Sequence, residues 1–221
     1  MKYSDIYRLY STSQPKDAIH QALREVSVDD SDEQYEDRSP LHLACQYGDT
    51  EGVKILLERD AEPNTKDANG STPIHILGRT SAGCADEDKL KEIAVVLMEH
   101  GANIPRSAKN TTALIECVRN RHFKMAEAII NSGTRVNSTD LNGENVLFGF
   151  CAASGDIRRD IRFAKKELDE SVQYSYPENK IEEIRSRIAR LEDDGEAAYR
   201  LARRLVEEDK VDPEDKSNSG K

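Results

Sequence analysis

The sequence predicts an all-α solenoid built from stacked helix-turn-helix repeats. Two observations carry this prediction: a motif that returns about every 33 residues, and a low content of apolar residues. Of the 221 residues, 37% are hydrophobic, 5% are aromatic and 33% are charged, and tryptophan is absent. This composition argues against one thick globular core. It suits a thin stack in which every element exposes much of its surface.

The first half of the repeat is a short motif that opens a helix. Serine or threonine can cap the free N–H groups of a helix start, and proline suits the first helical position. Pro73 follows Pro40 by 33 residues. The four copies, of which the last two are weaker, read SPLHLA at 39–44, STPIHIL at 71–77, TTALI at 111–115 and ENVLF at 144–148.

The second half of the repeat is an apolar helix that ends at a small or polar residue. Gly101 and Gly133 are expected to end this helix at positive φ, which glycine adopts without strain. Asn-Gly pairs at 69–70 and 142–143 suit the tight turn of a projecting hairpin. The copies read VKILLERDAEPN at 53–64, IAVVLMEHGAN at 93–103 and MAEAIINSGTRVN at 125–137.

This combination of period, opening motif and Gly-Ala ending resembles the ankyrin repeat. The resemblance covers roughly residues 16–156 and a tail near 200–221. It implies hairpin fingers, each followed by two antiparallel helices, stacked repeat on repeat. It also implies that His42 and His75 hold neighbouring loops by hydrogen bonds, with a metal or catalytic role as the alternative.

The repeat register divides the chain into a cap and four repeats. Leu23 precedes Pro40 by the same interval as Leu56 precedes Pro73. The first residues therefore resemble a degenerate repeat that caps the stack. We predict a capping repeat at 1–36, repeat 1 at 37–67, repeat 2 at 68–107 with a loop insertion at about 78–88, repeat 3 at 108–140 and repeat 4 at 141–221.

Repeat 4 is interrupted by an insertion. Its first helix is expected to end near Gly155, and the second-helix pattern returns only at Ala198. Apolar residues between them recur at helical spacing, which predicts an inserted antiparallel helical hairpin at about 157–197. The hairpin is interpreted as a structural embellishment, with a partner-binding or self-associating arm as the alternative. Residues 215–221 resemble the opening of a further repeat and suggest a fragment of a longer protein.

The cysteines favour a reducing compartment. The four cysteines form no CxxC pair and no disulfide framework. We therefore predict an intracellular protein, cytoplasmic or nuclear, or one delivered into a host cell if it is a bacterial effector. Cys45, Cys117 and Cys151 fall at the small-residue positions of the first helices and are expected to be buried, whereas Cys84 lies in the repeat 2 insertion.

The charge pattern limits the partners. A net charge of −10 disfavours binding to nucleic acid or to an anionic membrane. Residues 29–37 include six acidic side chains and no basic one, yet lack the central glycine and terminal glutamate of a calcium loop. A solvated acidic finger is favoured over a metal site, and it could meet a basic segment of a partner.

The motifs that carry catalysis are missing from the sequence. It contains no nucleophile elbow, HExxH motif, phosphate loop or zinc spacing, so we expect no enzyme activity, cofactor or metal. The chain is interpreted as a scaffold that binds a protein or peptide across a concave groove. The alternative is a targeting or regulatory domain of a larger enzyme or bacterial effector whose catalytic part lies beyond Lys221.

The resemblance places partner-binding residues at the finger tips and on the exposed side of the first helices. Tyr35 and Tyr47 are the expected anchors, because an exposed tyrosine gives much contact area at low entropic cost. The candidates are Tyr35, Glu36, Arg38, Gln46, Tyr47, Asn69, Ser71, Arg79, Lys109, Thr111, Arg119 and Asn120.

Overall fold

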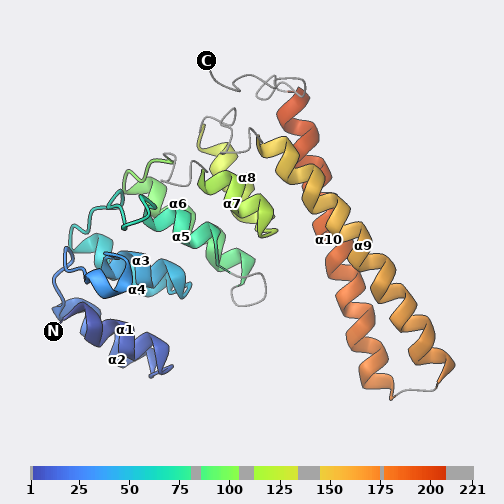
Figure 1. Cartoon of the computed structure of the whole chain (residues 1–221), viewed down its shortest axis with the longest axis horizontal. Coiled ribbons are helices and arrows are strands. Elements are labelled where there is room, and N and C mark those ends of the chain that lie inside the picture. The colour runs from blue at the N-terminus through green and yellow to red at the C-terminus, as the bar shows by residue number, and fades with distance from the viewer. Residues whose placement is uncertain (1, 81–85, 105–111, 134–144, 175–176, 208–221) are drawn as a thin grey trace.

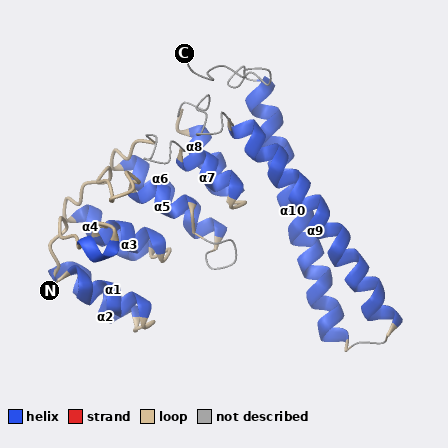
Figure 2. Ribbon diagram, in the orientation of Figure 1, coloured by secondary structure: helices blue, strands red, loops and turns tan. Residues whose placement is uncertain are grey.

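The computed structural model describes residues 2–80, 86–104, 112–133, 145–174 and 177–207. Within these residues every regular element is a helix, which confirms the predicted all-α repeat fold (Figures 1 and 2). The helices are α1 (Tyr3–Ser11), α2 (Lys16–Glu25), η1 (Glu33–Tyr35), α3 (Pro40–Gln46), α4 (Thr50–Glu58), α5 (Pro73–Gly78), α6 (Glu87–Glu99), α7 (Ala113–Arg119), α8 (Phe123–Asn131), α9 (Val146–Gln173) and α10 (Glu178–Glu207).

The helix pairs follow one another along a curved stack that begins at the N-terminus and ends in the long α9–α10 hairpin (Figure 1). Helices α3, α5, α7 and α9 pack in sequence as the first helices of successive repeats. Leu23 of α2 and Leu56 of α4 are both fully buried in the same core, as their shared register predicts. The N-terminal pair α1–α2 therefore packs as the first layer of the stack.

The first helices begin where the sequence motif predicts. Pro40 and Pro73 occupy the first turns of α3 and α5. At α3 the Ser39 N–H donates to Nδ1 of His42 at 3.1 Å, and at α9 the Asn145 side chain accepts from the N–H of Leu147 at 3.0 Å. These contacts satisfy N–H groups that a helix start leaves without partners.

The buried histidine of repeat 1 joins two neighbouring layers. Because Nδ1 of His42 accepts a hydrogen bond, its Nε2 carries the proton and donates to the Ser71 carbonyl at 3.0 Å. Burial lowers the pKa of His42, which keeps the ring neutral. The structural role that the resemblance implies for His42 is confirmed.

The second helices end as predicted, at residues with positive φ. Gly101 and Gly133 have φ of 87° and 79°. Asp60 takes the same left-handed conformation at the end of α4, with φ of 62°. Aspartate tolerates this region better than most residues, so the turn survives without glycine.

The expected end of helix one in repeat 4 is wrong. Helix α9 runs for 28 residues without a break and passes straight through Gly155. A glycine inside a helix costs only about 1 kcal/mol relative to alanine. Ile157, buried in the main core, and Ile161, packed against that core, lie on the next turns of α9, and their burial outweighs this cost.

Helices α9 and α10, the region predicted as repeat 4, pack along each other in a projecting hairpin, which we call the arm. The final turns of α10 return to the stack, where Ala198, Leu201 and Leu205 are buried in the main core. Farther out, Ala164, Ile184 and Ile188 form a separate small core between the two helices. The arm extends past the other repeats in Figure 1.

The repeat 2 insertion lies partly outside the described residues, which exclude 81–85 and with them Cys84. Helix α6 begins at Glu87, so the last two residues of the predicted loop, Glu87 and Asp88, belong to a helix. Asp86 caps this helix by accepting from the Asp88 N–H at 3.0 Å.

Candidate protein-interaction surface

Tyrosine side chains form a patch where the capping pair meets repeat 1. Tyr47 is 41% exposed and stacks on the buried Tyr10, with ring centroids 4.7 Å apart and planes 6° from parallel. Tyr35 packs on Tyr7 with centroids 4.3 Å apart and approaches Tyr3 at 5.6 Å. We call Tyr7, Tyr10, Tyr35 and Tyr47 the tyrosine patch.

The base of the tyrosine patch is held by a buried polar network. The Tyr10 hydroxyl donates to Oδ2 of Asp49 at 2.8 Å, and Nε2 of His20 lies 3.0 Å from both carboxylate oxygens. Burial and the neighbouring Asp49 charge raise the pKa of Tyr10 far above its usual value, so the phenol keeps its proton. Tyr47 therefore rests on a ring whose position is fixed.

Tyr35 is not the fully exposed anchor that the sequence suggested. Its ring is partly buried against α1, because the 3₁₀ turn Glu33–Tyr35 folds back onto the capping helices. Sequence reasoning also missed Tyr7. The spacing of Tyr3, Tyr7 and Tyr10 along one helical face was the signal that could have found it.

Three of the predicted residues, Glu36, Arg38 and Gln46, interact with one another through hydrogen bonds and an ion pair. Arg38 donates to Oε1 of Gln46 at 2.8 Å and pairs with Glu36 at 2.5 Å. Its Nε also lies 3.7 Å from Oδ2 of the buried Asp67, which belongs to the next finger. Asp67 in turn accepts from the N–H groups of Asn69 and Ser71 at 2.9 and 2.8 Å. Arg38 thus links two fingers, and its guanidinium is already engaged.

An equivalent link joins repeats 2 and 3. Arg79 donates to the Ser71 hydroxyl at 2.9 Å and to Oε1 of Glu116 at 3.1 Å. Asn120 donates to the Gly78 carbonyl at 3.0 Å, which ties α7 to the end of α5. These predicted residues therefore contribute to the stacking of repeats as well as to the surface.

The predicted candidates differ in accessibility. Tyr47, Glu36 and Arg119 are exposed, Gln46 and Asn69 are half-buried, and Ser71 is buried. Lys109 and Thr111 lie outside the described residues. Toward repeats 2 and 3, Arg79 pairs with Glu116 and Arg121 pairs with Asp160, so carboxylates already neutralise these two cations.

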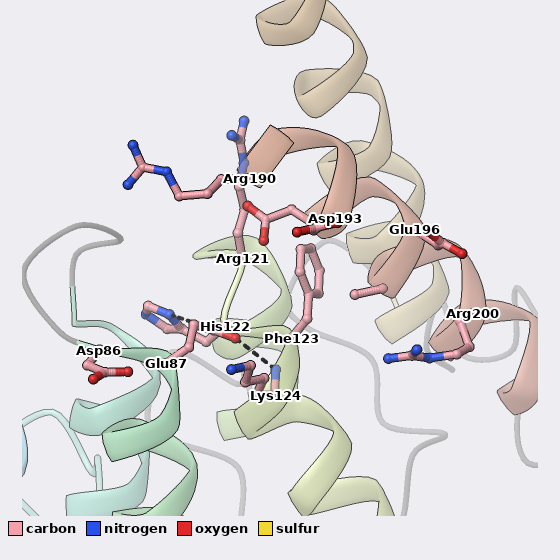
Figure 3. Close-up of a pocket in the computed structure, with 12 residues that line it drawn as sticks. Asp86, Glu87, Arg121, His122, Phe123, Lys124, Arg190, Asp193, Glu196 and Arg200 are labelled. Carbon is pink, nitrogen blue, oxygen red and sulfur yellow. Dashed lines mark hydrogen bonds and ion pairs between the residues drawn. The ribbon is translucent and has the colours of Figure 1, made fainter. Parts of the chain in front are cut away.

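A second candidate is a charged cleft of about 790 Å³ where the arm meets the stack (Figure 3). The start of α6, the α7–α8 turn and the middle of α10 contribute its walls. His122 is buried there, with Nε2 2.6 Å from the Thr80 carbonyl and Nδ1 3.3 Å from Oε1 of Glu87. The lining residues are Asp86, Glu87, Arg121, His122, Phe123, Lys124, Arg190, Asp193, Asp194, Glu196, Ala197 and Arg200.

Opposite charges alternate around this charged cleft. Burial, together with the Glu87 charge, raises the pKa of Asp194, while Arg121 acts in the opposite direction. Lys124 pairs with Asp88 at 2.8 Å, and its backbone N–H donates to Glu87 at 2.9 Å. No local motif reveals this cleft, because its walls come from three segments far apart in the sequence.

The surface and the architecture together define a solenoid of stacked two-helix repeats, a class of protein whose neighbouring repeats form one continuous face. Residues 23–77 match the family model described as ankyrin repeats (many copies). Over these residues the chain is thus similar to ankyrin repeats, as its motifs suggested.

Similar proteins share this region. The chain is 46% identical over 48 residues to a transient receptor potential cation channel subfamily A member 1 homolog of Caenorhabditis elegans, covering 22% of this chain and 4% of that protein. It is 31% identical over 134 residues to neurogenic locus notch homolog protein 1 of Mus musculus, covering 60% and 5%. For the human subfamily A member 1 channel the identity is 34% over 85 residues, covering 37% and 7%. The chain spans less than a tenth of the length of these relatives.

Among the described helices, none combines the length and the apolar character that crossing a lipid bilayer requires.

Proposed function

We propose that the chain is a non-catalytic scaffold that binds a protein partner across the fingers and the accessible side of α3, α5 and α7. Ankyrin repeats generally mediate protein–protein interaction, and the stacked first helices supply a continuous face for it. The observation that carries the proposal is the stacking of the exposed Tyr47 on the fixed ring of Tyr10.

A pre-positioned aromatic ring is well suited to anchor a partner. Interface hot spots are enriched in tyrosine, and a ring that is already ordered loses little entropy on binding. Tyr7 and Tyr35 extend the apolar surface beside it. The acidic segment 29–37 contains Tyr35 of this patch, so the partner is proposed to carry a basic segment that meets the acidic side chains.

The test is a matched pair of tyrosine substitutions. Tyr47→Ala removes the exposed anchor, while Tyr174→Ala removes a ring at the far end of α9 that is more accessible, at 67% against 41%. Partners captured by the intact chain are identified by mass spectrometry, and their affinities for the three proteins are compared. We expect Tyr47→Ala to weaken binding at least tenfold and Tyr174→Ala to leave it unchanged. Equal affinity for all three proteins would show that the patch is not the site.

Self-association through the arm is a second candidate. Phe163, Val172 and Tyr174 are 71%, 54% and 67% exposed on the outer surface of the arm, more than a solvated helix needs. Light scattering measures the mass of the intact chain and of a Phe163→Ser, Val172→Ser double variant. A dimer mass that falls to the monomer mass in the variant supports this candidate, and a monomer mass for both rejects it.

The alternative of a targeting or regulatory domain remains a proposal as well. This alternative is supported by the small fraction of its relatives' length that the chain covers. The sequence of the complete gene tests this alternative, because the alternative requires that the gene encode a catalytic domain beyond Lys221.

A further inference from the structure

The outer face of repeat 4 presents apolar residues at positions that the inner repeats bury. In repeats 1 to 3 the last turn of helix one carries Cys45, Gly78 and Val118 at equivalent positions, and all three are buried. A methyl group placed on Gly78 would lie 3.1 Å from the Ala113 carbonyl, so this position faces the first helix of the following repeat. The equivalent residue in repeat 4 is Cys151, which is exposed.

The expectation that Cys151 is a buried thiol is therefore wrong, for a physical reason. Its counterparts are covered by α5, α7 and α9, whereas none of the described residues forms a further repeat on the outer side of α9. The same contrast holds one turn earlier. His42, His75 and Ile115 are buried, and their counterpart Phe148 is 50% exposed.

A groove of about 730 Å³ runs between α9 and α10 on this face, and we call it the end groove. Phe148, Tyr199 and Val206 line it with exposures of 50%, 66% and 40%. Three large, exposed apolar side chains around one hollow form the kind of patch that marks an interaction site. Cys151, Arg158 and Arg203 also line it.

Basic residues border the end groove. Arg158 lines it and also lines a second hollow of about 560 Å³, which continues along α9 with Ile161 and Arg162. Among the described residues, neither Arg158 nor Arg162 pairs with a carboxylate, and Arg158 donates only to the Ser154 carbonyl at 3.2 Å. Arg203 is different, because Glu207 neutralises it at 2.6 Å.

We propose that the end groove binds an amphipathic helix of a partner protein, with its apolar side on Phe148, Cys151 and Tyr199 and acidic residues along the edge toward Arg158. The chain itself shows that this shape receives a helix, since α5, α7 and α9 each cover the equivalent positions of the preceding repeat. This site lies on a different face from the tyrosine patch and does not depend on it.

Charge argues for a partner helix over a second copy of this chain. A two-fold contact places the same patch on both sides of the interface. Arg158 and Arg162 of one copy would then lie close to Arg158 and Arg162 of the other. Like charges brought together in this way oppose association, whereas glutamate or aspartate on a partner helix would pair with them.

The probe is a synthetic amphipathic helix of about 16 residues with leucine along one face and glutamate elsewhere, the spacing that helix-in-groove recognition requires. The control peptide carries lysine in place of glutamate. Fluorescence anisotropy measures the affinity of each for the intact chain. We expect the acidic peptide to bind at least tenfold more tightly, and to slow alkylation of Cys151 measured by peptide mass mapping. Equal affinities, or no protection of Cys151, would overturn the proposal.

Variants locate the binding. Phe148→Ser and Tyr199→Ser should each weaken the acidic peptide at least tenfold, while Tyr174→Ser should not. Because Phe148→Ser could disturb α9, the double variant Arg158→Glu, Arg162→Glu provides an independent test, and it should reverse the preference toward the lysine peptide. Unchanged preference overturns the proposal. So does a dimer mass in light scattering that Phe148→Ser converts to a monomer mass, since a second copy then covers the groove.

Discussion

The same substitution should have opposite effects at two glycines, and the structure explains why. Gly52 lies in α4 and Gly155 lies in α9, so alanine should gain about 1 kcal/mol of helix propensity at either position. At Gly155 an added methyl group meets nothing within 4 Å. We therefore expect Gly155→Ala to raise the free energy of unfolding by about 0.5–1 kcal/mol.

At Gly52 the added methyl group has no room. It would lie 2.7 Å from Oδ2 of Asp49, 2.9 Å from Cδ1 of Leu23 and 2.9 Å from the Tyr10 hydroxyl. Overpacking costs about 1–3 kcal/mol. Weakening the buried hydrogen bond between Tyr10 and Asp49 adds about 1–3 kcal/mol. After the gain in propensity, Gly52→Ala should lower the free energy of unfolding by about 1–5 kcal/mol.

Urea unfolding followed by far-UV circular dichroism measures both variants against the parent chain. Tyr10→Phe serves as a further control, because it removes the hydroxyl without adding volume and should reproduce only the hydrogen-bond part of the loss. If Gly52→Ala and Gly155→Ala stabilise the chain equally, the close packing between α1, α2 and α4 is refuted.

Three further outcomes are expected. Leu56→Ala should lower the free energy of unfolding by about 2–5 kcal/mol in the same urea assay, because the side chain is fully buried, and a loss below 1 kcal/mol would contradict this. Burial lowers the pKa of His42 below its usual 6.5, so its contribution to stability is complete above about pH 6.5 and declines as the pH falls toward the folded pKa. Unfolding free energies at pH 7.5 and 5.5 should therefore differ less in His42→Gln than in the parent chain. Burial also raises the pKa of the Cys45 and Cys117 thiols, so maleimide should modify Cys151 quickly at pH 7.5 and the other two only after unfolding, which peptide mass mapping can follow.

The helix starts and ends could be predicted because their signals are local. A serine or threonine followed by proline starts α3 and α5, and a glycine follows α6 and α8. These signals act through neighbouring residues, and the structure places them as predicted. Local signals failed in α9, where Gly155 suggested a helix end. There the burial of Ile157 and Ile161 against distant parts of the chain decides the outcome.

The candidate site was less predictable because its geometry depends on contacts between repeats. The resemblance placed Arg38 and Arg79 on the surface, yet each pairs with a carboxylate far along the chain, Arg38 with Asp67 and Arg79 with Glu116. Cys151 shows the same limit. Its motif position matches buried residues of the inner repeats, and only its place at the outer side of the stack explains its exposure.

Helix α9 continues without a break from the stack into the arm, so a rotation at its base moves the far end of the arm. Its 28 residues span about 42 Å at 1.5 Å per residue. A tilt of roughly 10° at its junction with α7 would therefore sweep the far end through about 7 Å, a movement larger than the rise of one helical turn. The ion pair between Arg121 and Asp160 holds α9 about halfway along its length and resists such a tilt. Small changes in how repeat 4 sits on repeat 3 are thus amplified at the tip of the arm.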